Sequence, residues 1–235
     1  MAGSNHHDRR IAAMFDRIAP RYDRLNHLLS LGADAGWRRR AVAQAWLGPG
    51  ERALDIGVGT GDLAFGILRA SAAGARVAGI DISPAMLAIA SRRAAALGVG
   101  PRFHGVLASV EAIPFADETF HRAAAAFTIR NVAKLDVALR EIRRVLRPAG
   151  RVVILELHTP EGAVPRAIYR AYARVFPTLA GALGSDPDAY RYLPNSIEAF
   201  ADPDEVTRRL KDAGFREARH ERLTFGVAAI HVGEA

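Results

Sequence analysis

Three glycines at alternating positions follow Asp55 in the run LDIGVGTGDL. An apolar stretch precedes them and a helical pattern follows, which is typical of a turn from a strand into a helix. A turn without side chains lets a ligand approach the backbone and the helix N-terminus closely. A second acid, Asp81, ends another apolar stretch 20 residues beyond Gly61, where nucleotide-binding α/β folds use a carboxylate to bind ribose hydroxyls. The spacing therefore predicts a nucleoside ligand.

The spacing of the glycines and the acid before them indicate the kind of nucleoside. The dinucleotide fingerprint is G-x-G-x-x-G, whereas this chain has G-x-G-x-G. Asp55 would repel a pyrophosphate but suits a ligand with an ammonium or sulfonium charge. No lysine follows the glycines, which excludes a phosphate-binding P-loop. The pattern resembles the S-adenosylmethionine site of class I methyltransferases. A glycine-rich turn without a ligand is the weaker alternative, because it leaves the paired Asp81 unexplained.

This resemblance implies that the cofactor, S-adenosylmethionine, contacts the glycine loop, the end of the second strand and two later strand ends. The residues predicted to bind it are Asp55, Gly57, Gly59, Thr60, Gly61, Asp81, Ile82, Ser109, Val110 and Ala126.

Apolar runs and helical patterns alternate along most of the chain. Strands are expected at residues 52–56, 76–81, 102–107, 120–127, 151–157, 215–221 and 225–232. Ser83 and Pro84 have the residue types of a helix N-cap and first helical position. We predict an α/β fold with a doubly wound, seven-stranded, mostly parallel sheet. Residues 8–235 are expected to form a single domain, after a disordered leader at 1–7.

Two regions depart from this alternation. Residues 8–48 carry helical patterns interrupted at Pro20, with Asp34 as a candidate cap of the last helix, and are expected to cover the ligand crevice. Residues 161–200 are predicted to form a helical lid that contacts substrate. In this region, residues 161–184 have an apolar face opposite an arginine stripe, which suits a lid over a hydrophobic substrate at a membrane surface. An ordinary surface helix explains the same pattern equally well.

Composition limits the partners. The net charge is +7, but no aromatic-plus-basic nucleic-acid module is present, so we predict no nucleic-acid partner. The positive charge is at least as consistent with attraction to an anionic membrane surface as with nucleic-acid binding. Cysteine is absent, no metal site is predicted, and no apolar run approaches the roughly 20 residues of a membrane span. We expect a cytoplasmic protein, peripheral at the inner membrane face, and homodimer formation is compatible with the sequence.

Several further segments resemble one methyltransferase family. The run MFDRIAPRYD at 14–23, WRR at 37–39, EAIPF at 111–115, IRNV at 129–132 and YRYLPNSIEAF at 190–200 are similar to the ubiquinone/menaquinone C-methyltransferases, nearest to their demethylmenaquinone branch. The resemblance implies methylation of a ring carbon of a polyprenylated hydroquinone. One alternative is a paralogue acting on another phenolic metabolite. A cofactor-binding protein without chemistry is another.

The same resemblance implies which residues lie beside the acceptor. Arg130 is too basic to act as an ordinary base, so we predict that it stabilises a phenolate, unless it serves an ion pair. His158 is a candidate proton acceptor, with a structural hydrogen-bonded histidine as the alternative. Tyr22 is grouped with these two as catalytic. Asn131 and Tyr192 are predicted to contact substrate, although a tyrosine here can also serve packing.

Five positions depart from the family pattern. Ser109 and Val110 stand where the family usually has Asp-Ala, so the carboxylate that accepts a hydrogen bond from the adenine is missing. Ala126, Thr128 and His158 replace residues that are common in the family. These changes indicate either weakened cofactor affinity or a changed acceptor.

Overall fold

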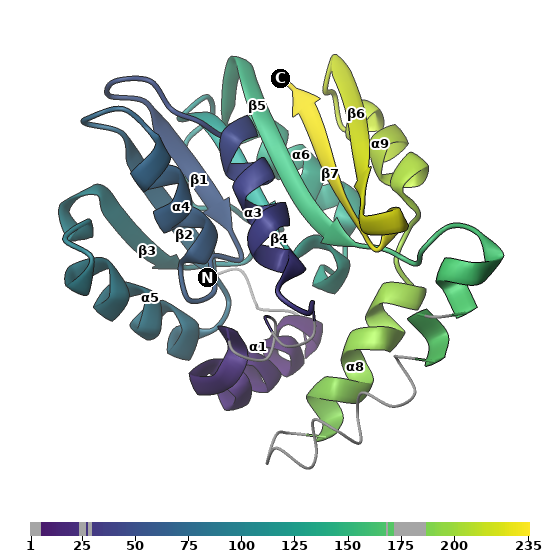
Figure 1. Cartoon of the computed structure of the whole chain (residues 1–235). Coiled ribbons are helices and arrows are strands. Elements are labelled where there is room, and N and C mark those ends of the chain that lie inside the picture. The colour runs from purple at the N-terminus through teal and green to yellow at the C-terminus, as the bar shows by residue number, and fades with distance from the viewer. Residues whose placement is uncertain (1–5, 24–26, 28–29, 168, 172–186) are drawn as a thin grey trace.

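The protein is described here from a computed structural model that covers residues 6–23, 27, 30–167, 169–171 and 187–235. Within them, one seven-stranded sheet has the order β3-β2-β1-β4-β5-β7-β6 (Figure 1). The strands are β1 (Arg52–Ile56), β2 (Arg76–Asp81), β3 (Phe103–Leu107), β4 (Phe120–Ala126), β5 (Leu146–Leu157), β6 (Glu217–Leu223) and β7 (Ala228–Glu234). Strands β1 to β5 pair in parallel, and β7 is antiparallel to both neighbours. The predicted fold class is confirmed.

Helices cover both faces of this sheet. They are α1 (His6–Ile18), α3 (Ala33–Gln44), α4 (Asp62–Ala70), α5 (Pro84–Ala96), α6 (Leu135–Val145), α8 (Pro187–Glu198) and α9 (Pro203–Asp212), with 3-10 turns η1 (Ala19–Arg21), η2 (Gly100–Arg102), η3 (Ile129–Asn131) and η4 (Thr224–Gly226). Helices α3, α4 and α5 pack in one apolar cluster, and α6 and α9 pack in a second. Because both faces are covered, the central strands are apolar on both sides.

The alanine-rich strand β4 shows how the two clusters share one element. Ala124 belongs to the cluster of α3, α4 and α5, whereas Ala123 and Ala125 belong to the cluster of α6 and α9. Successive side chains of a strand point to opposite faces, so these three alanines are buried alternately against the two helix layers. The predicted assignment of this segment as strand rather than helix is confirmed.

Several element boundaries differ from the sequence prediction. Helix α1 begins at His6, so His6 and His7 are helical rather than part of a leader. Gly32, at φ 81°, occupies the N-cap position of α3, and Asp34 lies in the first turn instead. Strand β5 begins at Leu146, and its pairing with β4 shifts register before position 151. Ser83 caps α5 as predicted, accepting a hydrogen bond from the Met86 amide.

The switch in strand order falls between β1 and β4, and this is where open α/β sheets bind ligands. Helices α1 and α8 lie beyond the carboxyl ends of these strands (Figure 1). Of the predicted lid helix at 161–184, residues 163–167 and 169–171 are helical, and the rest lies outside the described residues. In the part of the chain described here, no helix is both long and apolar enough to cross a membrane.

Candidate active site

The glycine loop after β1 depends on residues without side chains. Gly57 and Gly61 have φ values of 63° and 95°, and a Cβ on either would overlap the side chain of Thr128 or Phe65, respectively. A Cβ added to Gly59, by contrast, would have room, because the nearest atom, the Gly57 carbonyl oxygen, lies 4.0 Å away. The loop is therefore closed by packing on its protein side and open toward the adjoining cavity, so a ligand can approach its backbone.

Asp81 fixes this loop from the end of β2. Its Oδ2 accepts a hydrogen bond from the Gly59 amide at 2.8 Å, and its Oδ1 accepts one from the Ser83 amide at 2.9 Å. Burial raises the pKa of Asp81, and these amide donors oppose that shift. Because a carboxylate oxygen can accept more than one hydrogen bond, Asp81 can still bind the hydroxyls of a ribose. The structure thus places Asp81, the predicted ribose-binding acid, beside the glycine loop.

Asp55 is the least compensated acid of the site. It is fully buried, and neither carboxylate oxygen has a hydrogen-bond partner of ordinary geometry among the described residues. Burial raises its pKa to about 8, against smaller opposing effects of the Ala64 amide and the Arg38 guanidinium. A buried carboxylate without a partner is costly. A cationic ligand in the hollow beside it would relieve that cost.

Two adjoining hollows meet at Gly57 and Gly59. The larger holds about 660 Å³ of open space, including its mouth, and the smaller about 320 Å³. The predicted residues Gly57, Gly59, Asp81, Ile82, Ser109 and Val110 line the larger hollow. Asp55, Thr60 and Ala126 line the smaller one, whereas Gly61 lines neither. A nucleoside attached to an amino acid matches this pair of connected spaces.

The N-terminal segment is tied to these hollows by hydrogen bonds that sequence reasoning missed. The Ser83 hydroxyl donates to Asp16 Oδ1 at 2.5 Å. The Thr60 hydroxyl donates to Asp23 Oδ1 at 2.6 Å, and Arg93 contacts the other oxygen of Asp23 at 3.0 Å. The signal was present in the sequence, because both acids lie in the motif at 14–23 that supported the family resemblance.

Comparison with known proteins establishes the family. The sequence model of the ubiE/COQ5 methyltransferase family matches residues 3–235. This chain belongs to that family. It is 50% identical to the demethylmenaquinone methyltransferase of Thermus thermophilus, over 94% of this chain and 99% of the relative. It is 41% identical to the ubiquinone/menaquinone biosynthesis C-methyltransferase UbiE of Geotalea daltonii, over 96% of each chain.

Solved structures share the fold at lower identity. An S-adenosylmethionine-dependent methyltransferase of Thermotoga maritima, described as a possible histamine N-methyltransferase, superposes with a TM-score of 0.67 at 21% identity, covering 94% of this chain and 98% of the other. A second, from Aquifex aeolicus, has a TM-score of 0.61 at 19% identity, covering 84% and 88%. The cofactor of this ubiE/COQ5 family member is S-adenosylmethionine. The open glycine loop and the unpartnered Asp55 fit it.

A buried ion pair lies next to the part of η3 that lines the larger hollow. Arg130 Nη1 donates to Glu156 Oε1 at 2.6 Å and to the Phe127 carbonyl at 2.6 Å. The two charged side chains are 5% and 0% exposed. Burial acts to lower the pKa of Arg130, but Glu156 and two nearby tyrosines outweigh it and raise the pKa. Arg130 is therefore held as a cation, and the ion pair that the sequence left as an alternative is present.

Sequence reasoning missed Glu156, although a signal was available. It is the single acid in the otherwise apolar run VVILEL of β5. An ionisable residue in the centre of a buried strand needs a partner of opposite charge. Its partner, Arg130, lies 26 residues away in η3, at the end of the neighbouring strand β4.

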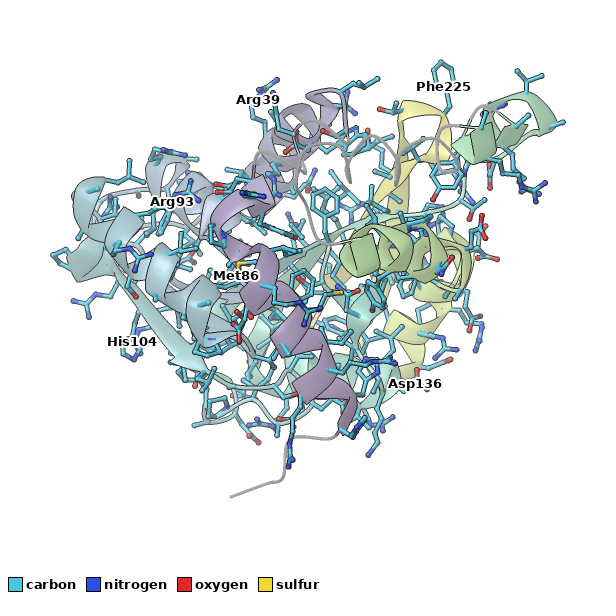
Figure 2. All side chains as sticks on the ribbon, turned by 90° about the horizontal axis from the view of Figure 1, so that it is seen from below. Arg39, Met86, Arg93, His104, Asp136 and Phe225 are labelled. Atoms are coloured by element: carbon cyan, nitrogen blue, oxygen red, sulfur yellow. The ribbon has the colours of Figure 1, made fainter. Side chains whose placement is uncertain are left out.

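The two predicted substrate residues lie in contact. The Tyr192 hydroxyl, from α8, donates to Asn131 Oδ1 at 3.0 Å. The Asn131 carbonyl meets His7 Nε2, from α1, at 2.8 Å. Tyr22 lines the larger hollow, and its ring packs edge-on against Phe15 with ring centres 5.8 Å apart. Tyr22, which follows η1, and Asn131 of η3 thus meet at the larger hollow, and Tyr192 of α8 reaches it through Asn131. Figure 2, seen from below, shows α1 and α8 in front of the sheet.

The structure does not place His158 at this site. Its Nδ1 bonds to the Ala201 carbonyl at 3.1 Å, and its Nε2 bonds to His231 Nε2 at 3.0 Å. It is buried, lines neither hollow, and burial lowers its pKa. Both ring nitrogens are occupied, so His158 is not available to accept a proton from a substrate. The structural alternative, a hydrogen-bonded histidine, is the interpretation that fits these contacts.

Proposed function

We propose that this protein methylates a ring carbon of a polyprenylated hydroquinone, converting demethylmenaquinol to menaquinol or acting at the equivalent step for a ubiquinone precursor. The observation that carries the proposal is the buried ion pair between Arg130, in η3, and Glu156, in β5. Neither residue lines either hollow itself, but Thr128 and Asn131, on either side of this part of η3, line the larger one. A cation held there can stabilise a phenolate as the acceptor hydroxyl loses its proton. The names of the relatives from Thermus thermophilus and Geotalea daltonii support the same substrate class.

The bound cofactor supplies an electrophilic methyl group. The chain's own residues then have to make the acceptor carbon nucleophilic and hold it in line. Deprotonation of the neighbouring hydroxyl raises electron density on the ring, and Arg130 stabilises the resulting negative charge. Glu156 holds Arg130 in one orientation through both carboxylate oxygens. Its Oε1 accepts a hydrogen bond from the guanidinium, and its Oε2 accepts one from the Arg130 backbone amide at 3.2 Å. Alignment contributes much of the acceleration in such a displacement.

Tyr22, Asn131 and Tyr192 complete the proposed acceptor pocket. Burial raises the pKa of Tyr192, so its hydroxyl stays protonated and keeps its bond to Asn131, while its oxygen can accept a hydrogen bond from a substrate hydroxyl. That hydroxyl already contacts Asn131, which positions it from the far side of the site. Because Arg130 stays charged and His158 is occupied elsewhere, we expect water to carry the acceptor proton away.

A labelled-methyl assay tests this proposal. A naphthoquinol and a benzoquinol with the same prenyl chain are incubated side by side with the enzyme and labelled S-adenosylmethionine. We expect label in the naphthoquinol at the higher rate. Cofactor binding without transfer to either quinol would contradict the proposal.

The departures at Ser109, Ala126 and Thr128 favour one second candidate, methylation of another phenolic metabolite. Complementation of a strain that lacks quinone methylation separates the two. Restored quinone methylation supports the quinol, whereas failure by a folded, cofactor-binding protein supports the other acceptor.

We further propose that the edge formed near η4 contacts an anionic membrane surface at the cytoplasmic face of the inner membrane. Phe225 is 82% exposed at the tip of η4, and Figure 2 shows it on the same edge as Arg39. The hydroxyl of the neighbouring Thr224 accepts a hydrogen bond from Trp37 Nε1 at 2.9 Å, so this tip is fixed to α3. An exposed aromatic on the same edge as an arginine suits a lipid interface.

Vesicle co-sedimentation measures this contact. We expect binding to anionic vesicles that weakens in Phe225→Ala, and weaker binding to neutral vesicles. The matched control is Leu107→Ala, which removes another exposed apolar side chain, 60% exposed on the edge strand β3. Equal losses in both variants would contradict a specific edge. Homodimer formation stays a prediction, and light scattering of the purified protein checks it.

A further inference from the structure

The adenine end of the cofactor site lacks an obvious acidic partner in the loop after β3. With the ribose at Asp81, the base extends toward the ends of β2 and β3, where Ile82 and Val110 form apolar walls. Adenine carries an exocyclic amino group, a donor that needs an acceptor when it is buried. The nearest loop hydroxyl, Ser109 Oγ, already accepts a hydrogen bond from the Glu111 amide at 3.3 Å.

Helix α1 brings a different carboxylate to the same hollow. Asp8 lines it and is only 8% exposed. It makes no hydrogen bond or ion pair with any other residue that the structure describes. The second acid that lines this hollow, Glu111, accepts a hydrogen bond from the Lys134 amide at 2.8 Å through its Oε1. Its other oxygen makes Glu111 the competing acceptor, which the Glu111→Gln variant tests. Unlike those of Asp55, the carboxylate oxygens of Asp8 are not fully enclosed. A donor on a ligand in the hollow can therefore reach them.

Contacts at both ends of α1 hold Asp8 in place. The preceding residue, His7, bonds to the Asn131 carbonyl at 2.8 Å. Farther along the helix, Asp16 Oδ1 accepts hydrogen bonds from the Ser83 hydroxyl at 2.5 Å and the Ala85 amide at 3.2 Å. Between them, Ile11 packs in a cluster that includes Ile82. Helix α1 is therefore held across the part of the larger hollow where we expect the adenine. Asp8 lies one helical turn before Ile11, which packs near Ile82 in the wall of that hollow.

We propose that Asp8 accepts the hydrogen bond of the adenine amino group, so that α1 supplies the acidic partner that the loop after β3 lacks. The inference rests on S-adenosylmethionine as the cofactor and not on the identity of the acceptor. It makes the N-terminal helix part of the cofactor site rather than a cover only. It also predicts selectivity for a purine with a donor at this position.

Calorimetric titration with two product analogues tests the assignment without turnover. S-adenosylhomocysteine carries the amino group, and S-inosylhomocysteine carries a carbonyl oxygen instead. We expect the wild type to prefer the first by tenfold or more, on the order of what a charge-assisted hydrogen bond contributes. Asp8→Ala should lose most of that preference. Asp8→Asn can donate to the carbonyl, so it should bind S-inosylhomocysteine more tightly than the wild type does.

Three controls keep the outcome interpretable. Glu111→Gln and Ser109→Ala should keep the wild-type preference, whereas Asp81→Asn should weaken both ligands alike because it acts at the ribose. Thermal unfolding of each variant without ligand checks that α1 still packs. Preference retained in a folded Asp8→Ala, or lost in Glu111→Gln or Ser109→Ala, would overturn the proposal. If no quinol is methylated but the protein still prefers S-adenosylhomocysteine to S-inosylhomocysteine, the proposed acceptor is wrong and the role of Asp8 stands.

Discussion

The cofactor half and the acceptor half of this site are built in different ways. The cofactor half is centred on backbone turns and two acids between Asp55 and Ser83, within one stretch of chain, with walls added by later strand ends and by α1. The proposed acceptor half uses side chains from η3, β5 and α8 and from Tyr22, which follows η1, with partners up to 61 residues apart. Backbone turns tolerate little change because their dihedral angles are unusual. Side-chain assemblies can be altered one member at a time, which suits a family whose acceptors differ.

Breaking the buried ion pair should have the largest effect. Glu156→Gln leaves the buried Arg130 charge uncompensated, so we expect a loss of about 3–5 kcal/mol in unfolding free energy. Denaturant unfolding measures it. Replacing both residues by apolar ones of similar volume should recover most of the stability but none of the methyl transfer. If the double variant stays as unstable as Glu156→Gln, the loss does not come from the orphaned charge.

The glycine loop should follow closely in size. Gly57→Ala forces a side chain into a left-handed turn and against Thr128, and we expect a loss of about 2–4 kcal/mol. Calorimetry should detect no S-adenosylhomocysteine binding. Gly50→Ala is the matched control, because Gly50 has a φ of 72° but no atom within 4 Å. Equal losses in both variants would attribute the effect to backbone strain alone.

Asp55, in the cofactor half, should make the unfolding free energy depend on pH. Its folded pKa of about 8 is above the ordinary value of 3.8, so between these pH values the folded protein holds the extra proton. The unfolding free energy of the ligand-free protein should therefore fall as pH rises, by up to about 1.4 kcal/mol per pH unit. Asp55→Asn should flatten that slope and weaken cofactor binding. An unchanged slope in Asp55→Asn would contradict the assignment to this carboxyl.

The smallest effect is expected at the acceptor pocket. Tyr192→Phe removes one hydrogen bond to Asn131, for a loss of about 1 kcal/mol in transition-state stabilisation. Steady-state kinetics should give a severalfold lower kcat with unchanged S-adenosylhomocysteine affinity. Reduced affinity for that ligand would mean that the two halves are not separable at Tyr192.

Much of this protein follows from sequence alone, because the signals are local. The glycines and acids between 55 and 81 define a nucleoside site through turn geometry and strand-end chemistry. Apolar periodicity gave the bounds of β1 and β2 and identified β4 as a strand despite its alanines. The family motifs identified the cofactor and the class of acceptor. Each of these depends on residues close together in the chain.

The tertiary structure decided which side chains are free to act. Arg130 and His158 both follow strand ends and both appeared suited to catalysis, yet one is paired with Glu156 beside the site and the other with His231 away from it. Asp8 belongs to a segment that the sequence predicts only to cover the ligand crevice, yet it lines the larger hollow. Such outcomes depend on contacts between distant segments, set by sheet register and by the packing of α1 and α8. Periodicity in one segment contains no information about the partner that another segment brings.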